Sequence, residues 1–358
     1  MKFGAHYLPT HVPELDGPEP EFYRRMFEQM ELLDEAGYHQ VWVTEHHFRE
    51  YGGSIPDPST FLSAVAGRTK RIRMGIAIVV LPFHNPLLTA ESYAMVDVLS
   101  GGRLEFGIGR GTASELAAFN IGYEESVGRL REGAEVIRQA WSQEQVDFRG
   151  EVYQYEGVRV LPRPVQQPHP PFWIAASRSD DTYRWAGEQG HHLLTLPSLN
   201  DTEMLRTNIG NYREALRKAG HDPATREVLG KFHIYVADSV QAAVKEAGPY
   251  LNNYWALSRD ANPIVTTERR IDPEEEIEAG RVIAGESQRC IDIIRRFQEA
   301  LGLTVVTGTF YFGGLPQELA LRNIRRFAEE VMPAFAAPGP TPSQPALRRG
   351  SGNAVPHS

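Results

Sequence analysis

Residues 41–48 read Val-Trp-Val-Thr-Glu-His-His-Phe, so a short apolar run leads directly into three ionisable side chains. The apolar part consists of β-branched and aromatic residues, which predicts a buried strand. Because side chains alternate along a strand, burial of the two valines under covering helices would turn His46 toward the opposite face. In a barrel that face is the interior, so we expect the strand end to deliver His46 to a pocket, with Glu45 and His47 as its supports. A histidine that merely caps a strand is the simpler alternative.

Strands and helices alternate on both sides of this stretch. Residues 72–81 form a continuous apolar run, which is typical of a strand covered on both faces. Short connections between the alternating elements indicate parallel strands joined by right-handed crossovers. We therefore predict an α/β fold, a (β/α)8 TIM barrel with insertions. About eight strands are expected, over residues 2–8, 41–43, 72–81, 104–108, 171–176, 191–197, 228–237 and 304–312.

Two further segments complete the predicted organisation. Residues 146–160 predict a surface hairpin after the fourth strand, turning near Gly150. Residues 337–358 are rich in Pro, Ser and Gly and have no apolar periodicity, which predicts a disordered tail after a barrel domain of residues 1–336. A doubly wound open sheet would alternate in the same way, but no Gly-x-Gly-x-x-Gly motif follows the first strand.

The composition is that of a globular protein, with 41% hydrophobic and 23% charged residues among 358. Lys and Arg total 37 against 46 Asp and Glu, and the net charge of −9 argues against nucleic acid or an anionic membrane as a partner. The single cysteine, Cys290, excludes an internal disulfide and a Cys-rich metal site. No segment approaches the roughly 18 apolar residues of a membrane span, and no signal-peptide pattern opens the sequence, so we expect a cytoplasmic protein.

Candidate functional residues follow four predicted strands, at the end where barrels of this kind carry their active sites. They lie in residues 45–47, 77–82, 109–112 and 176–179. The last two segments offer backbone N–H groups and a guanidinium to a phosphate. Gly109 and Gly111 let the backbone approach a ligand, and Arg110 presents a planar donor fork. Ser177 and Ser179 precede a predicted helix, whose N-terminus favours an anion. The alternative is that these serines only cap the helix.

A metal site is the main competing interpretation of the Glu-His-His sequence, since two histidines and a carboxylate are common ligands. Adjacent strand residues point in opposite directions, so Glu45, His46 and His47 do not readily converge on one ion. His84 and the pair 191–192 are expected to be isolated. We therefore predict no metal, and the absence of a Gly-x-Ser-x-Gly motif argues against a serine nucleophile.

Several motifs, in this order and spacing, resemble bacterial luciferase, its α subunit especially, and the wider luciferase-like flavin monooxygenases. The resemblance covers residues 1 to about 335. It is carried by Met1-Lys2-Phe3-Gly4, Trp42-Val43-Thr44-Glu45-His46-His47-Phe48, Val80-Leu81-Pro82, Ser100-Gly101-Gly102-Arg103, Phe106-Gly107-Ile108-Gly109-Arg110-Gly111 and Cys290-Ile291-Asp292-Ile293-Ile294.

The resemblance implies a TIM barrel that takes reduced FMN from a separate flavin reductase. Such an enzyme reacts the flavin with O2 to a flavin hydroperoxide and oxygenates a small, largely apolar organic substrate. It also implies catalytic roles for His46 and Glu45, and a non-prolyl cis peptide between Ala77 and Ile78 under the flavin ring. The cofactor-binding residues that it implies are Ala77, Ile78, Gly109, Arg110, Gly111, Thr112, Ala176, Ser177 and Ser179.

Two departures from luciferase bear on the substrate. Gly109 stands where the luciferase α subunit has a reactive cysteine, and it is expected to open space near the flavin. Residues 262–285 form a short acidic stretch in place of the long luciferase lid. We therefore expect another substrate than a long-chain aldehyde, and no strong luminescence.

Two other functions stay open at this point. One is a deazaflavin-dependent oxidoreductase of the same superfamily, which transfers hydride without oxygen. The other is a non-catalytic flavin-binding dimer partner, which would not need both His46 and Arg110. By the same resemblance we expect a homodimer, formed through the helix of residues 22–33 and the one that starts near Thr60.

Overall fold

The computed structural model describes residues 1–261 and 271–336, and its centre is a closed barrel of eight parallel strands. Neighbouring strands pair in the order β9-β11-β1-β2-β3-β4-β7-β8, and β8 pairs with β9 to close the barrel. This confirms the predicted (β/α)8 TIM barrel. The strands are β1 (Lys2–Tyr7), β2 (Gln40–Val43), β3 (Arg73–Val80), β4 (Leu104–Gly109), β7 (Phe172–Ala175), β8 (His192–Thr195), β9 (Val228–Val236) and β11 (Val305–Thr309).

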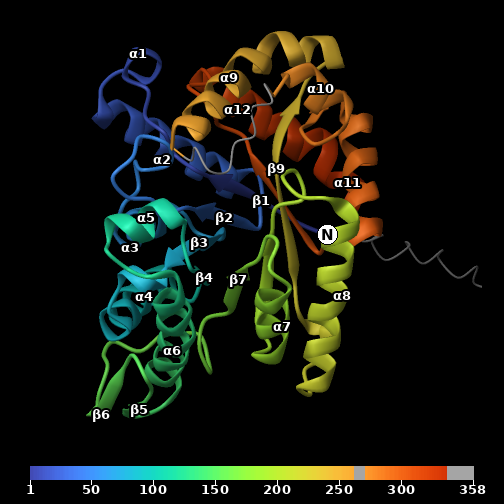
Figure 1. The fold of residues 1–358 in the computed structure, drawn as a ribbon. Helices are drawn as coiled ribbons and strands as arrows, with labels where there is room; N and C mark the ends of the chain where they lie inside the picture. The colour runs from blue at the N-terminus through green and yellow to red at the C-terminus, as the bar shows by residue number, and fades with distance from the viewer. Residues whose placement is uncertain (262–270, 337–358) are drawn as a thin grey trace, which may run out of the picture.

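Helices surround the strands on the outside (Figure 1). The long ones are α2 (Glu19–Glu35), α3 (Pro58–Arg68), α4 (Pro86–Ser100), α6 (Tyr123–Ser142), α7 (Asp180–Glu188), α8 (Thr202–Lys218), α9 (Val240–Ala261), α11 (Ser287–Leu301) and α12 (Gln317–Arg326). The predicted hairpin is present as β5 (Val146–Arg149) and β6 (Gln154–Val158), and Gly150 N–H bonds Tyr153 O across its turn.

Four short elements were not predicted. They are α1 (Pro13–Asp16), α5 (Ala113–Ala118), α10 (Pro273–Glu278) and β10 (Ile283–Gly285), which pairs with β9. The closing helix, expected over residues 316–335, is divided into α12, a π-helical turn Phe327–Val331 and a 3-10 turn Met332–Phe335. The remaining 3-10 turns are Leu81–Phe83 and Pro223–Thr225.

The barrel interior is filled by large apolar side chains beneath the mouth. Trp42 packs edge-on against Trp173 at a ring distance of 5.1 Å, in a cluster with Leu194, Leu229 and Val305. A Cβ atom on Gly75 would lie 2.2 Å from the Trp42 ring, so β3 needs glycine at this point. The Val-Trp-Val alternation of β2 thus places Trp42 inside, as predicted, and leaves the strand end to the site.

The predicted dimer helices use their apolar residues within the chain. Phe22, Met26 and Leu33 of α2, and Phe61 of α3, are buried in the core. Large exposed apolar side chains lie instead on α4, and they are Leu88, Met95, Val98 and Leu99. The buried residues of α2 and α3 are therefore not available for pairing, and pairing through the two helices stays a prediction.

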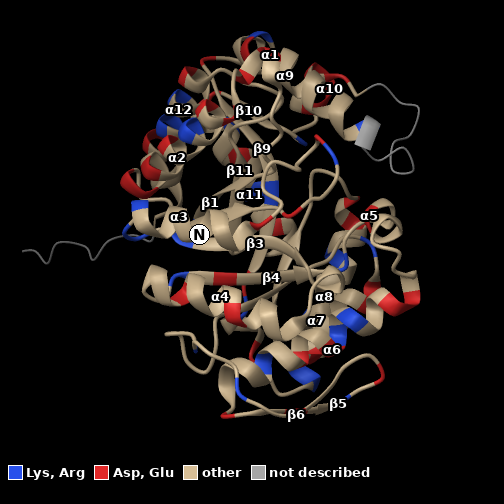
Figure 2. Cartoon of the chain, turned by 90° about the vertical axis from the view of Figure 1, so that its left-hand side faces the viewer, with Lys and Arg blue, Asp and Glu red and all other residues tan. Residues whose placement is uncertain are grey.

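Charged residues of both signs are spread over the helices and loops (Figure 2). Cys290 is buried in α11, as its apolar surroundings predicted. Within residues 1–261 and 271–336, no helix is long and apolar enough to cross a bilayer. The predicted tail, 337–358, and residues 262–270 of the expected short lid lie outside the described residues.

Candidate active site

A cavity of about 730 Å³ opens at the carboxyl ends of β2, β3, β4 and β7. The barrel brings these strand ends together, because parallel strands all end on the same rim. Every predicted site residue lies on the cavity wall: Glu45, His46, Ala77, Ile78, Gly109, Arg110, Gly111, Thr112, Ala176, Ser177 and Ser179. The structure therefore places these residues in one cavity, while their catalytic and cofactor-binding roles stay predictions.

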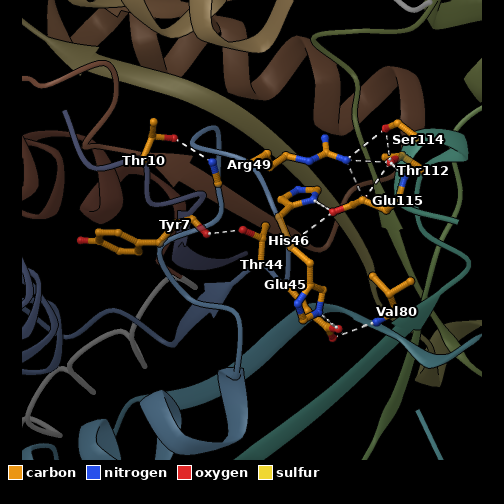
Figure 3. Close-up of polar contacts among 12 residues, drawn as sticks. Tyr7, Thr10, Thr44, Glu45, His46, Arg49, Val80, Thr112, Ser114 and Glu115 are labelled. Carbon is orange, nitrogen blue, oxygen red and sulfur yellow. Dashed lines mark hydrogen bonds and ion pairs between the residues drawn. The ribbon is translucent and has the colours of Figure 1, made fainter. Parts of the chain in front are cut away.

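His46 is held by a carboxylate that the sequence did not single out. Its Nδ1 lies 2.9 Å from Oε1 of Glu115, and the same oxygen accepts the backbone N–H of His47 at 3.1 Å. The other oxygen of Glu115 accepts the Thr112 hydroxyl at 2.7 Å and lies 3.1 Å from the Arg49 guanidinium. Figure 3 shows the His46 ring directed at Glu115, with Arg49 extending to the same carboxylate.

This arrangement fixes the tautomer of His46. Burial alone would raise the pKa of Glu115, but hydrogen bonds from His46 and Thr112 and the charges of His46 and Arg49 lower it to about 2. An ionised carboxylate only accepts hydrogen bonds, so Nδ1 of His46 is the donor. The described residues supply no hydrogen-bond partner to Nε2, which is the nitrogen left to act on a ligand.

Glu45 makes no hydrogen bond to His46, so the prediction that it supports this histidine directly was wrong. Its Oε1 lies 2.8 Å from Nε2 of His47 and 2.6 Å from Nε2 of His84, and its Oε2 accepts the Val80 backbone N–H at 3.0 Å. His84 is therefore not isolated, as was expected, but shares this carboxylate. Burial lowers the pKa of His84, but the hydrogen bond to Glu45 and the negative charge of Glu45 together raise this pKa above its usual value.

The ligand atoms of Glu45, His47 and His84 lie within 4.8 Å of one another, so these three could hold a metal ion. The predicted divergence of side chains does hold for His46, which turns to Glu115 instead. The Glu45 carboxylate also accepts hydrogen bonds from both histidines and from the Val80 backbone, and the absence of a metal stays a prediction.

The opposite wall of the cavity carries the predicted phosphate-binding residues. Arg110 lies 4.0 Å above the Tyr123 ring, and no carboxylate among the described residues pairs with it. Gly111 has a φ of +82°, and a Cβ there would lie 2.5 Å from Val80. Ser179 precedes α7, but its side chain makes no capping hydrogen bond. Among the described residues, the wall therefore combines a guanidinium without an acidic partner, a glycine packed against Val80, and a serine that does not cap its helix.

The sequence matches the luciferase-like monooxygenases over residues 1–304. The chain belongs to this family. The oxygenase component of flavin-dependent trigonelline monooxygenase from Acinetobacter baylyi is 30% identical over 341 residues, which cover 89% of this chain and 91% of that protein. These findings confirm the resemblance and identify the luciferase-like protein as an oxidoreductase.

Solved structures agree with this assignment. The crystal structure of monooxygenase RslO1 from Streptomyces bottropensis is 31% identical, with a TM-score of 0.85, and the match covers 94% of this chain and 100% of that one. The coenzyme F420-dependent tetrahydromethanopterin reductase from Methanopyrus kandleri is 18% identical, with a TM-score of 0.73, covering 94% of this chain and 99% of that one. At that identity the second likeness concerns the fold alone.

The luciferase-like cis peptide is present between Ala77 and Ile78, as the resemblance implied. The expectation that Gly109 opens space near the flavin was wrong. A Cβ at Gly109 would lie 2.2 Å from Cδ1 of Ile78, so the Ile78 side chain occupies the space where a larger residue would project.

Two residues of the luciferase-like site escaped the sequence analysis, namely Glu115 and Arg49. A local pattern could have pointed to Glu115. Thr112-Ala-Ser-Glu115 has the spacing of a capping box, and the Thr112 hydroxyl indeed accepts the Glu115 N–H at 3.4 Å at the start of α5. Nothing local indicates that the carboxylate reaches His46, which lies 69 positions away in the sequence.

Proposed function

We propose that this protein is an FMN-dependent monooxygenase whose barrel, residues 1–336, forms one catalytic domain. It takes reduced FMN from a separate flavin reductase and uses O2 to oxygenate a small, largely apolar organic molecule. The observation that carries the proposal is the pairing, across one cavity, of His46 held by Glu115 with the phosphate cradle around Arg110.

The residues present fit FMN. Gly109 and Gly111 lie on the cavity wall, and no acidic partner among the described residues competes with a phosphate for Arg110. Ser177 and Ser179, with the backbone at Thr112, add donors along the same wall. Ala77 and Ile78 line the cavity beside them, where they would contact a flat ring. When bound, the reduced flavin supplies the electrons that activate O2.

His46 supplies the single controlled proton site. Its Nδ1 is committed to Glu115, so Nε2 can hold or move a proton at the cofactor. Ile78, Val80 and Leu196 give this part of the cavity apolar walls, which exclude water from the reacting atoms. Glu45 acts as a positioning residue, because it ties the end of β3 at Val80 to the segment that carries His46.

A deazaflavin-dependent reaction is the second candidate, because this protein shares its fold with an F420-dependent reductase. The phosphate cradle would serve either cofactor. The choice between them is therefore experimental.

We also propose that the protein is a homodimer. The exposed apolar face of α4, with Leu88, Met95 and Leu99, is the surface that a second copy would cover. Helix α2 offers less exposed apolar surface, because Phe22, Met26 and Leu33 are buried in the chain's own core.

Anaerobic titration with reduced FMN, and separately with reduced F420, tests the cofactor assignment. We expect reduced FMN to bind, and Arg110→Met to weaken binding by about tenfold or more, because it removes a charge-assisted phosphate contact. Arg149→Met is the matched control, since Arg149 lies on the exposed hairpin. Binding of F420 without binding of FMN would overturn the proposal.

Mixing the loaded protein with aerated buffer then tests the reaction class. Bound reduced FMN is expected to be reoxidised more slowly than free reduced FMN, and His46→Ala is expected to remove most of this difference. Identical reoxidation kinetics in the wild-type protein and His46→Ala would refute the role of His46.

A further inference from the structure

A buried lysine faces a second cavity without an ionic partner. Lys231 of β9 is 6% exposed, and none of the described residues places a carboxylate or a hydrogen-bond acceptor against its Nζ. Nζ of Lys231 lies 5.8 Å from the centre of the Tyr254 ring, at the distance of a cation–π contact. The cavity measures about 190 Å³ and lies at the same end of the barrel as His46. Burying an uncompensated ammonium is costly, so this lysine requires an explanation.

The strands next to Lys231 turn further unsatisfied polar groups toward the barrel interior. Lys231 pairs in register with Thr307, and His233 with Thr309, so these four residues share one face. Among the described residues, buried Nε2 of His233 has no hydrogen-bond partner, and neither do the hydroxyls of Thr307 and Thr309. On β1, Nδ1 of His6 is also unsatisfied. This part of the interior therefore has hydrogen-bonding capacity that the chain itself does not use.

Three cationic side chains, those of Lys231, Arg259 and Arg281, line this cavity, and Lys231 is the buried one. Burial lowers the pKa of Lys231 to about 8, so the ammonium form still predominates at pH 7. Burial, and then the charge of Lys231, lowers the pKa of His6 and of His233 well below the usual histidine value, so both imidazoles are neutral. Arg281, also on the cavity wall, is paired with Glu276 at 2.6 Å.

The cavity is close to the proposed catalytic histidine. The Tyr51 ring lies 6.4 Å from the His46 ring, and the Tyr51 hydroxyl donates to the Tyr254 hydroxyl at 2.7 Å. Tyr254 in turn packs edge-on against His233 at 4.5 Å. Two aromatic side chains, Tyr51 and Tyr254, therefore lie between His46 and the region of Lys231.

We propose that Lys231 binds the negatively charged oxygen group of the substrate, a carboxylate or a phenolate on a compact organic molecule. This inference rests on the proposed function and specifies the substrate class of the same site. His233 completes the recognition by hydrogen bonding, while Tyr254 and Trp255 contact the apolar part. The substrate's neutral part then extends toward His46.

Calorimetric titration with sodium benzoate, and with benzamide as its neutral counterpart, tests this proposal. The proteins are the wild type, Lys231→Met and the control Lys245→Met, whose side chain is exposed on α9. We expect benzoate to bind the wild type and Lys245→Met, and to bind Lys231→Met at least about tenfold more weakly. Benzamide should bind the wild type at least about tenfold more weakly than benzoate.

Proton uptake gives a second measurement that needs no variant. A bound anion favours the ammonium form, so benzoate binding at pH 8.5 should take up protons from the buffer, and binding at pH 6.5 should take up far fewer. Titrations in two buffers of different ionisation enthalpy measure this number. The result is independent of whether Lys231→Met folds.

Three results would overturn the proposal: no benzoate binding by the wild type at millimolar concentration, equal affinities for benzoate and benzamide, or benzoate affinity of Lys231→Met within twofold of the wild type. Titration of the same samples with reduced FMN keeps the two proposals apart. FMN binding without anion recognition refutes only the Lys231 site. Anion recognition without FMN binding refutes only the cofactor assignment.

Discussion

Replacement of Glu115 tests whether the carboxylate that holds His46 is needed for both stability and activity. Its two oxygens serve His46, the His47 backbone, Thr112 and Arg49, and its side chain is 2% exposed. Glu115→Ala removes the carboxylate from Arg49, whose side chain is only 9% exposed. Breaking a buried ion pair by removing one partner costs about 3–5 kcal/mol. We expect a loss of that size in the free energy of unfolding.

The pKa of Glu115 gives a similar magnitude for the free energy that this carboxylate contributes to folding. Burial raises this pKa, but the hydrogen bonds and charges around the carboxylate lower it from 4.5 to about 2. That difference corresponds to about 3 kcal/mol of stabilisation. Because the pKa is lowered in the folded state, the stabilisation is present above about pH 4.5 and is lost as the pH falls toward 2.

Urea unfolding at pH 6, followed by circular dichroism, measures the loss for Glu115→Ala and Glu115→Gln. The control is Glu144→Gln, because Glu144 is exposed. Glu115→Gln keeps the shape of the side chain and should lose less stability than Glu115→Ala. It should still slow turnover by about 10- to 100-fold, because the His46 tautomer is no longer imposed. A loss below about 1 kcal/mol for Glu115→Ala would refute the assigned network.

Three further predictions follow from packing and from bound groups. Gly75→Ala should lower the free energy of unfolding by about 1–3 kcal/mol, because its Cβ would meet Trp42, whereas Gly67→Ala in α3 has open space and should raise it by about 0.5–1 kcal/mol. Urea titration measures both. Prolonged dialysis against EDTA should leave turnover unchanged, because the oxygens of Glu45 already accept hydrogen bonds. Leu99→Lys should convert a dimer to a monomer in sedimentation velocity, with little change in melting temperature, because Leu99 is 59% exposed.

Each of these predictions has a clear contrary result. Equal losses for Gly75→Ala and Gly67→Ala would contradict the assigned contact with Trp42. A stoichiometric metal in the purified protein, with activity lost on its removal, would contradict the hydrogen-bonded role of Glu45. Sedimentation of Leu99→Lys at the wild-type rate would contradict the α4 interface.

The barrel could be predicted because its information is local and repeated. Each strand is a short apolar run, each long helix has its own apolar stripe, and the connections are short. The missed elements, such as α5 and β10, have only six and three residues. Periodicity needs more residues than that to be recognised. Their positions depend on pairing and packing with distant parts of the chain.

Only the site residues that follow the ends of strands could be predicted from the sequence. His46 and Arg110 directly follow strands, so their presence at the barrel mouth follows from the fold. The partners of Glu45 and His46 depend on loop geometry instead. His84 lies 39 positions from Glu45, and Glu115 lies 69 positions from His46. Side-chain alternation along one strand cannot indicate such contacts.

The two carboxylates next to histidines perform different tasks, and this difference limits the chemistry of the cavity. Glu45 takes up the Nε2 atoms of His47 and His84, so neither nitrogen is left for a ligand. Glu115 takes up Nδ1 of His46 and leaves its Nε2. Of these three histidines, only His46 lines the cavity, and Glu115 sets its tautomer. Exchange of one bound proton at that atom then requires no rearrangement of the neighbouring histidines, because their hydrogen bonds are made to a different carboxylate.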